Sequence, residues 1–449
     1  MTATETPLPR AARLDRLPFT REHGRLVVGS GMGWALDAMD VGLVSSVLLQ
    51  VREQWDLSAG EASWIGSIGF VGMALGASLG GLLADRFGRR QVFAMTLLVF
   101  GIATGASALA WSLGALLVFR FLTGLGLGAE LPVASTLVSE FAPARVRGRV
   151  VVGLEAFWAL GWTLAALIGF LLVPRSDAGW RWALALGAVP ALYAVVVRRG
   201  LPESVRFLEL RGRTEEAEAV VRRFEAAAGV EPVPSPPATP AAPTRARGLW
   251  APGLRGSTAA LWIVWFCVNF SYYGAVIWLP SLLFDSGFSL VRSLGFTLVI
   301  TLAQLPGYAV AAWLIETWGR RPTLATFLVG SAVGAGLFAG ADGGTAVLLT
   351  GMLLSFFNLG AWGALYALTP EVYPTALRAT GAGSAAGFGR IASILAPLSV
   401  PPLLGLGGSG LVFGTFAAFF VVGALATFGL PERRGEALEE RTPAAVPAR

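Results

Sequence analysis

Lysine is absent from the 449-residue chain, cysteine and histidine each occur once, and only 14% of the residues are charged. A single cysteine, Cys267, excludes an internal disulfide. The one histidine, His23, lies outside the long apolar runs, so the sequence offers neither a metal-ligand cluster nor a nucleophile–histidine pair, and it contains no P-loop. These absences argue against intramembrane hydrolysis and ATP-driven pumping. They predict a protein that is not an enzyme and that needs no cofactor or metal.

The chain is rich in apolar sequence instead. Hydrophobic residues make up 55% of it, and the mean hydropathy is +0.65. A soluble domain carries about 25% charged residues. Apolar runs recur along the chain, each long enough to cross a hydrocarbon core of roughly 30 Å. The sequence therefore predicts a polytopic protein of the lipid bilayer. We attribute the basic pI of about 10.2 to membrane topology and expect no nucleic acid partner.

Twelve apolar segments are long enough to be membrane-spanning helices, and they form two sets of six. The first set covers residues 25–50, 62–84, 91–112, 114–139, 150–172 and 179–198; the second covers 258–284, 292–314, 322–340, 344–369, 377–404 and 409–429. The predicted fold class is an all-α membrane protein with twelve transmembrane helices. The first 25 residues are polar and lack an apolar core, so no cleaved signal peptide is predicted.

Arginine is concentrated in alternate connections between these segments. The clusters lie at the N-terminus, at 86–90, 145–149, in the long centre, at 320–321, at Arg378 and at 433–434, whereas the intervening loops carry few. The positive-inside rule then predicts that both termini are cytoplasmic and that the protein lies in the cytoplasmic (inner) membrane.

Three loop sequences occur twice, about 230 residues apart. "ADRFGRR" (84–90) returns as "IETWGRR" (315–321), "SEFAPARVRG" (139–148) as "PEVYPTALRATG" (370–381), and "LPESVR" (201–206) as "LPERRG" (430–435). Parallel repeats of six spans predict two pseudo-symmetric bundles, at 25–200 and 258–430, with a substrate site near the bilayer midplane between them. The remaining ranges are cytoplasmic: tails at 1–24 and 431–449, and a central segment at 201–257. In that segment we expect a helix over about 205–228, followed by a disordered Pro-rich linker.

The repeated loops resemble those of the major facilitator superfamily over essentially the whole chain. "GLLADRFGRR" matches the superfamily's loop between helices 2 and 3, and the second copy departs from it in Ala312 and Glu316. "RFLTGLGLGAE" resembles its helix 4 motif. "LPESVR" resembles the end of helix 6 in the sugar-porter, organic-ion and synaptic-vesicle-glycoprotein branches. The resemblance implies the major facilitator fold.

A finer resemblance lies in "GWALDAMDVGLVSSVL", residues 33–48. This stretch is similar to helix 1 of the nicotinate transporter group and of the aromatic acid:proton symporters. The symporters more often read Asp-Gly-Phe-Asp where this chain reads Asp-Ala-Met-Asp, and the difference favours the nicotinate group. The resemblance implies a small aromatic monocarboxylate as substrate, with nicotinate as the best candidate.

Four charged residues in the first set of spans are candidates for proton coupling: Asp37, Asp40, Glu130 and Arg120. Asp37 and Asp40 are three residues apart, which places them on one helix face about 4.5 Å apart along the axis. A carboxylate at mid-membrane costs about 2.5–3.5 kcal/mol on insertion scales, so it usually faces a cavity or a partner. The alternative is a structural pair bonded to a neighbouring helix, and Glu155 is a candidate partner for Glu130. Resemblance to the helix 4 motif implies a proton-transfer role for Arg120, which can also act as an anchor at the outer end of its span.

Substrate binding is expected in the second set of spans. Arg390 is the only charge in "GAGSAAGFGRIASILAPL" (381–398), and a guanidinium can hold a carboxylate through two parallel hydrogen bonds. In the related organic-anion branch, a cation at the matching place in helix 11 is associated with anion binding. An alternative is a salt bridge from Arg390 to Asp40 or Glu130. Candidates for a ring site, which can equally be packing or interface residues, are Asn269, Tyr272, Tyr273, Gln304, Asn358, Trp362 and Tyr366.

A gating network is predicted in the arginine-rich loops. The positive-inside rule alone explains the arginines, and the family resemblance adds that Asp85 caps a facing helix and bonds loop arginines in one conformational state. The residues assigned to this network are Gly81, Asp85, Arg86, Gly88, Arg89, Arg90, Glu140, Arg145, Arg149, Glu316, Gly319, Arg320, Arg321, Glu371 and Arg378. Glu203 and Arg206 are further candidates for this network.

Together these expectations describe a secondary transporter, functional as a monomer, that imports nicotinate or a similar acid with a proton by alternating access. Within transport, a sugar or polyol symporter and an exporter of amphipathic drugs or organic ions remain alternatives. A non-transporting sensor on the same scaffold is the alternative from another class. A sugar site requires more Gln and Asn than the spans contain, and intact gating loops in both halves argue against a sensor.

Overall fold

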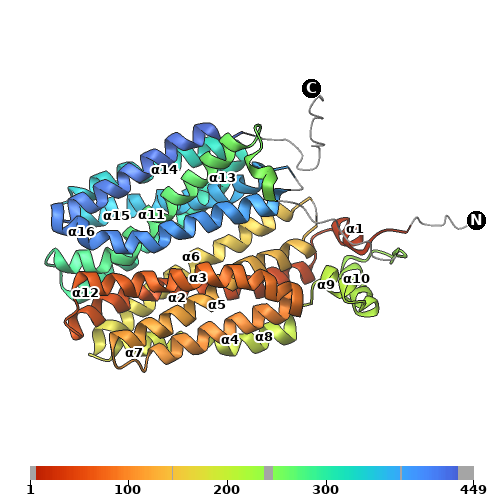
Figure 1. Ribbon diagram of the computed structural model, residues 1–449, viewed down its shortest axis with the longest axis horizontal. Coiled ribbons are helices and arrows are strands. Elements are labelled where there is room, and N and C mark those ends of the chain that lie inside the picture. Colours follow the sequence, from red (N-terminus) through yellow and green to blue (C-terminus); the bar gives the residue numbers. More distant parts are fainter. Residues whose placement is uncertain (1–6, 144, 237–245, 375–376, 433–449) are drawn as a thin grey trace, which may run out of the picture. The chain divides into compact units, whose positions relative to one another are not determined.

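A computed structural model describes residues 7–143, 145–236, 246–374 and 377–432. Every regular element in these residues is helical (Figure 1). The helices of the first half are α1 (Arg10–Asp15), α2 (Arg21–Gln54), α3 (Ala59–Phe87), α4 (Arg89–Ser107), α5 (Leu113–Phe141), α6 (Arg147–Leu172), α7 (Gly179–Leu186) and α8 (Val189–Gly200). The short helices α9 (Val205–Leu210) and α10 (Thr214–Ala228) follow, so the helix predicted over 205–228 is present as two pieces. Residues 237–245 of the linker predicted to be disordered, and Arg433 and Arg434, lie outside the described residues.

The second half contains α11 (Arg255–Asp285), α12 (Leu290–Leu302), α13 (Gln304–Thr317), α14 (Arg320–Ala339), α15 (Gly343–Leu368) and α16 (Arg378–Ala426). Short 3₁₀ turns lie at Val173–Arg175, Ala246–Trp250, Thr369–Glu371 and Thr427–Gly429. Two crossings are each divided in two: α7 with α8 spans Gly179–Gly200, and α12 with α13 spans Leu290–Thr317.

The last helix, α16, makes two crossings. Its 49 residues would extend about 74 Å as one straight helix, more than twice a hydrocarbon core of roughly 30 Å. The backbone leaves helical geometry at Gly407 and at Gly408, whose φ of 65° favours glycine. Of the described residues, eleven segments are long and apolar enough to span a membrane, and the break in the last one gives the twelve predicted crossings. The predicted fold class is confirmed.

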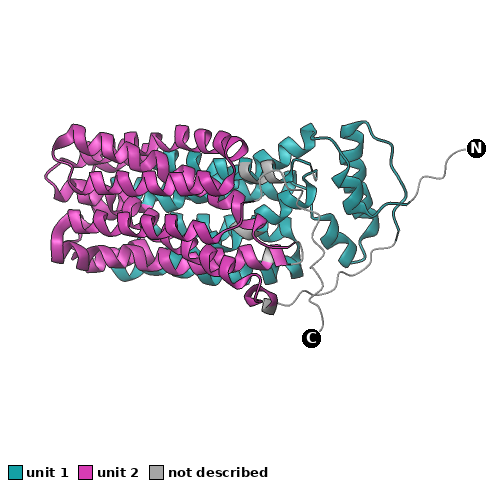
Figure 2. Ribbon diagram, turned by 90° about the horizontal axis from the view of Figure 1, so that it is seen from above, with its two compact units in different colours: residues 1–43, 68–165, 178–242 teal, residues 44–67, 166–177, 243–449 magenta. Residues whose placement is uncertain are grey.

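By contacts, the chain divides into two compact units, coloured separately in Figure 2. Unit 1 comprises residues 1–43, 68–165 and 178–242, and unit 2 comprises 44–67, 166–177 and 243–449. In unit 1, α4 packs against α5 and α8. In unit 2, α11 packs along α16, and α14 lies against α15 and α16 (Figure 1). The assignment of the bundles to 25–200 and 258–430 stays a prediction.

Glycines let α3 and α5 approach each other closely. A Cβ atom added at Gly76 would lie 2.2 Å from the carbonyl oxygen of Leu125, and one added at Gly128 would lie 2.0 Å from that of Met73. Gly72, Gly80 and Gly124 are equally crowded by the facing helix. Small residues four apart allow such backbone contact between membrane helices, where no hydrophobic effect draws apolar faces together. This packing fixes α5, which carries Arg120 and Glu130, against α3.

Candidate functional site

Asp40 and Arg120 form a buried ion pair in unit 1. Arg120 Nη1 and Nη2 donate to Asp40 Oδ1 and Oδ2 at 3.2 and 3.0 Å, which is a two-pronged contact. Thr104 on α4 also donates to Asp40 Oδ1, at 2.5 Å. Asp40 is 0% exposed and Arg120 is 4% exposed. Three helices, α2, α4 and α5, therefore hold one carboxylate away from solvent, and protonation of that carboxylate would weaken its bond to Arg120.

Asp37 and Glu130 form a second acidic site in unit 1. Both side chains are fully buried, and their charges interact. Within the residues that the structure describes, the two carboxyl oxygens of Glu130 accept no hydrogen bond. Gly33 leaves room for Glu130, because a Cβ atom there would lie 2.9 Å from Glu130 Oε1. Asp37 and Asp40 thus belong to different clusters: Asp37 lies near the acid Glu130, and Asp40 binds Arg120.

Arg390 is half-buried on α16 in unit 2. In the described part of the chain it makes no ion pair and no side-chain hydrogen bond. A guanidinium within a membrane helix normally has a partner, because burying a charge without one is costly. An unpaired cation within an apolar helix has the chemistry of an anion site. The alternative, a salt bridge from Arg390 to Asp40 or Glu130, stays a prediction.

Aromatic rings from α11 and α15 form one cluster beside this region. Trp362 stacks on Tyr366 with ring centroids 5.6 Å apart, and it meets Tyr272 and Tyr273 edge-on at 5.8 and 6.4 Å. Trp265 packs edge-on against Trp362 and Tyr366. Four of the predicted ring-site residues therefore lie together. Whether they bind a ring stays a prediction.

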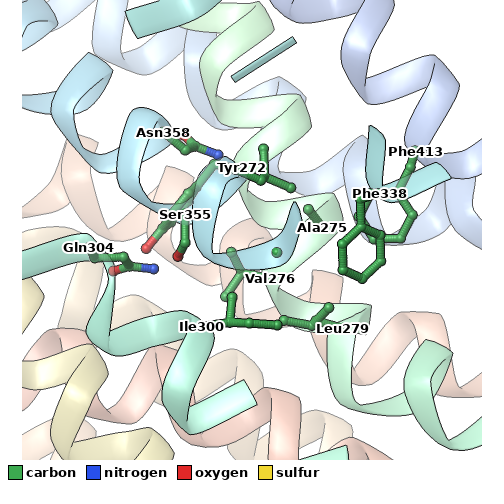
Figure 3. Close-up of a pocket in the computed structure, with 12 residues that line it drawn as sticks. Tyr272, Ala275, Val276, Leu279, Ile300, Gln304, Phe338, Ser355, Asn358 and Phe413 are labelled. Carbon is green, nitrogen blue, oxygen red and sulfur yellow. The ribbon is translucent and has the colours of Figure 1, made fainter. Parts of the chain in front are cut away.

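A small cavity lies within unit 2, between α11 and helices α12–α16 (Figure 3). Its walls include three residues proposed from sequence, Tyr272, Gln304 and Asn358. Ser355, which the sequence interpretation did not single out, joins them.

Asn269 occupies a different environment from these residues. Its amide nitrogen donates to the carbonyl oxygen of Trp265 at 2.7 Å, and its oxygen accepts from Ser393 at 2.9 Å. The side chain thus joins α11 to α16, one turn from Arg390. This contact helps to position Arg390, and a direct role of Asn269 in substrate binding stays a prediction.

The first copy of the gating motif surrounds the start of α4. Gly88 precedes α4 with φ of 97°, which favours glycine. Arg89 pairs with Asp85 at 2.9 Å and approaches Glu140 at 3.9 Å. Glu203 Oε1 accepts from the backbone N–H groups of Arg89 and Arg90 at 2.8 and 3.1 Å. A carboxylate at a helix N-terminus accepts hydrogen bonds from unpaired N–H groups, and its negative charge interacts favourably with the positive end of the helix dipole.

The second copy repeats this arrangement at the start of α14. Gly319 precedes the helix with φ of 108°. Arg320 pairs with Glu371 at 3.0 Å, as Arg89 approaches Glu140 in the first copy. Glu432 accepts from the backbone N–H of Arg321 at 2.8 Å, as Glu203 does at Arg89 and Arg90. The glutamate of each "LPE" repeat therefore caps the helix that follows a Gly-Arg-Arg sequence.

The remaining gating residues have individual environments. Arg378 donates to the carbonyl oxygen of Pro370 at 3.1 Å, and Arg321 lies over the ring of Phe428. Gly81, Arg145 and Glu316 are exposed, as is Arg86, which lies against Phe87. Arg149 lies on α6, and its side chain is outside the described part of the structure. The gating role of all these residues stays a prediction.

Three contacts were not anticipated from the sequence. Thr104 is one of many threonines in apolar helices, and nothing in its local sequence indicates a bond to Asp40. Glu432 could be predicted from the sequence, because it occupies the place in the second "LPE" repeat that Glu203, a candidate for the gating network, occupies in the first. Arg52 at the end of α2 pairs with Asp285 at the end of α11 at 2.7 Å, both within unit 2. Their partnership is invisible in the sequence, where more than 200 residues separate them.

These features define a multi-pass integral membrane protein. The fold is that of a major facilitator transporter. It matches the structure of the partially occluded inward open conformation of the xylose transporter XylE from E. coli with a TM-score of 0.76, at 19% sequence identity, over 93% of this chain and 100% of that one.

The chain belongs to the sugar (and other) transporter family, whose model matches residues 27–444. It is 47% identical over 396 residues to the niacin transporter NiaP of Acinetobacter baylyi, covering 88% of this chain and 90% of the relative. It is 48% identical over 379 residues to the putative niacin/nicotinamide transporter NiaP of Bacillus subtilis, covering 84% and 88%. The family membership predicted from the loop motifs is confirmed, and the protein is a transporter and not an enzyme.

Proposed function

We propose that the protein imports nicotinate together with a proton by alternating access. The observation that carries the substrate is the identity of 47% and 48% over most of the chain to two proteins named for niacin transport. We further propose that it lies in the inner membrane with both termini cytoplasmic, as the arginine distribution predicts, and that it acts as a monomer.

Arg390 holds the substrate carboxylate in this scheme. Nicotinate carries a negative charge at neutral pH, and Arg390 is a half-buried guanidinium with no protein carboxylate bound to it in the described residues. A two-pronged contact fixes both the position and the orientation of the acid. The aromatic cluster of Tyr272, Trp362 and Tyr366 supplies flat faces for the ring.

Asp40 carries the proton in this scheme. While Asp40 is ionised, its bonds to Arg120 and Thr104 join α2, α4 and α5. Protonation removes the charge that Arg120 binds, so the contact weakens and the three helices can move apart. Binding of the proton and the anion together adds no net charge to the site, which lowers the electrostatic cost of closing it to water compared with binding the anion alone.

The first test is uptake of radiolabelled nicotinate into proteoliposomes, with and without an inward proton gradient. Gradient-driven accumulation is expected in the wild type, loss of accumulation in Asp40→Asn, and a KM raised by about tenfold or more in Arg390→Ala, since a charged hydrogen bond contributes about 1.5–3 kcal/mol. Asp342→Asn and Arg255→Ala remove exposed charges of the same types and are matched controls that should transport normally.

The possible failures of this test have separate meanings. Uptake that does not depend on the proton gradient would refute the proposed proton coupling but would not contradict nicotinate as the substrate. No uptake by folded wild-type protein would refute the nicotinate assignment. Xylose, a nicotinamide probe and organic cations would then be screened as thermal-shift ligands, since the family also includes sugar transporters.

A further inference from the structure

The cavity of unit 2 has two chemically different sides. Figure 3 shows Gln304, Ser355 and Asn358 on one side, and Leu279, Phe338 and Phe413 on the other. The polar side comes from α13 and α15, and the apolar side comes mainly from α11, α14 and α16. The lining therefore combines hydrogen-bonding groups on one side with apolar groups on the other.

The two amides on the polar side are buried without their hydrogen bonds satisfied. Gln304 and Asn358 are each 2% exposed. Within the described residues, Gln304 Oε1 and Asn358 Oδ1 have no hydrogen-bond partner. Most buried polar atoms in proteins are paired, so each such exception requires an explanation.

Asn269 shows that this chain can satisfy a buried amide when the role is structural. It is also 2% exposed, and both ends of its amide bind protein atoms, at Trp265 and Ser393. Gln304 and Asn358 lie in the same unit and line a cavity instead of joining two helices. The difference leaves these two amides available to a ligand.

We propose that Gln304 and Asn358 bind the ring nitrogen of a pyridine carboxylate and thereby select it over a benzene carboxylate. This inference rests on the proposed function and adds which aromatic acids the transporter distinguishes. A pyridine nitrogen has an in-plane lone pair that accepts one N–H, and either amide can donate that N–H after rotation about its terminal torsion. Tyr272 lines this cavity and also belongs to the aromatic cluster proposed to face the ring. Benzoate presents a C–H group at the same position, so it leaves the buried amide donor unpaired.

The expected selectivity follows from this asymmetry. A site built to hydrogen-bond its substrate rejects an analogue that lacks the bond, because the polar group of the protein is then left buried and unpaired. We expect nicotinate to bind about 10- to 100-fold more tightly than benzoate, although the two acids have the same shape and charge.

The test measures inhibition of radiolabelled nicotinate uptake by unlabelled nicotinate and by benzoate, in wild type, Gln304→Met and Asn358→Leu. Both substitutions keep the side-chain shape and remove the amide. The ratio of the two inhibition constants should fall from about 10–100 toward 1 in at least one variant, with nicotinate weakened and benzoate unchanged or strengthened. Retained benzoate inhibition would show that the variant is folded. Ile300→Val is the matched control: it trims the apolar wall of the same cavity and should change both constants together, leaving the ratio at its wild-type value.

Two other outcomes separate this inference from the proposed function. If wild-type protein transports nicotinate but binds benzoate equally well, the inference fails and the function stands. The inference also fails if the ratio is unchanged in both amide variants. If wild-type protein takes up no nicotinate at all, the proposed function itself has failed.

Discussion

Asp40 is the residue whose environment is most completely specified. Its two carboxyl oxygens accept three hydrogen bonds, two from Arg120 and one from Thr104, and the side chain has no exposed surface. A buried ion pair of this kind contributes little net stability compared with an apolar pair, yet loss of one partner is costly because a charge stays buried alone. Such a pair is therefore a sensitive point at which one proton can change the packing of three helices.

This asymmetry predicts the stability of variants at the pair. Arg120→Leu should destabilise the protein by about 3–5 kcal/mol, because it leaves the Asp40 carboxylate buried without a cation. The double variant Asp40→Asn with Arg120→Leu should recover most of that loss, while both variants lose gradient-driven uptake. Thermal unfolding in one detergent at pH 7 measures the difference. Equal stability of wild type and Arg120→Leu would contradict the ion pair.

At the scale of elements, the ends of α2 and α3 contact helices of the second half within unit 2. Arg52 pairs with Asp285 of α11, and Ser67 of α3 donates to the carbonyl oxygen of Ile394 of α16 at 3.0 Å. Beside them, Gly66 lies close to Pro397. In a transporter that alternates access, contacts between the two halves of the sequence must break in one state and form in another.

We predict that the Arg52–Asp285 pair favours the conformation seen here. Arg52→Asp and Asp285→Arg should each slow uptake several-fold, because like charges shift the conformational equilibrium away from this state. The charge-swapped double variant should recover most of the rate. Uptake at saturating nicotinate, with protein quantified in the membrane, measures this effect. A double variant no better than the singles would show that the two side chains do not act as a pair.

At the scale of the whole molecule, the helices were predictable and the contacts between them were not. Apolar length alone locates twelve crossings, and even the break near 404–409 follows from its glycines. Some helix ends differ from the prediction: the span expected at 25–50 is Arg21–Gln54, because polar turns continue a helix beyond the membrane, whereas the span expected at 91–112 ends at Ser107. The buried charges were identifiable because charge in an apolar helix is costly. The partners of these charges were not identifiable. The spacing predicts that Asp37 and Asp40 act together, whereas the packing around α2 places Asp37 near Glu130 and Asp40 against Arg120.

The N-terminal segment packs on the central segment through a buried ion network, which makes this region sensitive to acid. Arg13 is 0% exposed and donates to Glu225 at 2.9 and 2.6 Å and to Glu218 at 2.8 Å. Burial by itself raises the pKa of Glu218, but the hydrogen bonds from Arg13 and Arg222 outweigh it, and the pKa is lowered overall. The stabilisation is therefore present above the unfolded pKa of about 4.3 and is lost as pH falls through the lower folded value.

We accordingly expect α1 to stay docked on α10 from pH 7 to about pH 5 and to be released at lower pH. Hydrogen exchange of residues 10–16 and 214–228 measures this release. Arg13→Ala should show the same release at pH 7, and replacement of the pair by Arg13→Met with Glu225→Leu should restore docking without the acid sensitivity. Protection that does not change at any pH below about 4.3 in the wild type would contradict the role of Glu218.

The close contact of α3 and α5 has a consequence for sequence variation. At Gly72, Gly76, Gly124 and Gly128 the facing backbone occupies the space that any side chain would need. In a saturation library selected for growth on limiting nicotinate, these positions should tolerate no other amino acid, whereas the lipid-facing positions between them should accept most apolar residues. Substitutions should then be depleted at every fourth residue in two distant stretches of the gene, and this pattern would identify α3 and α5 as neighbouring helices.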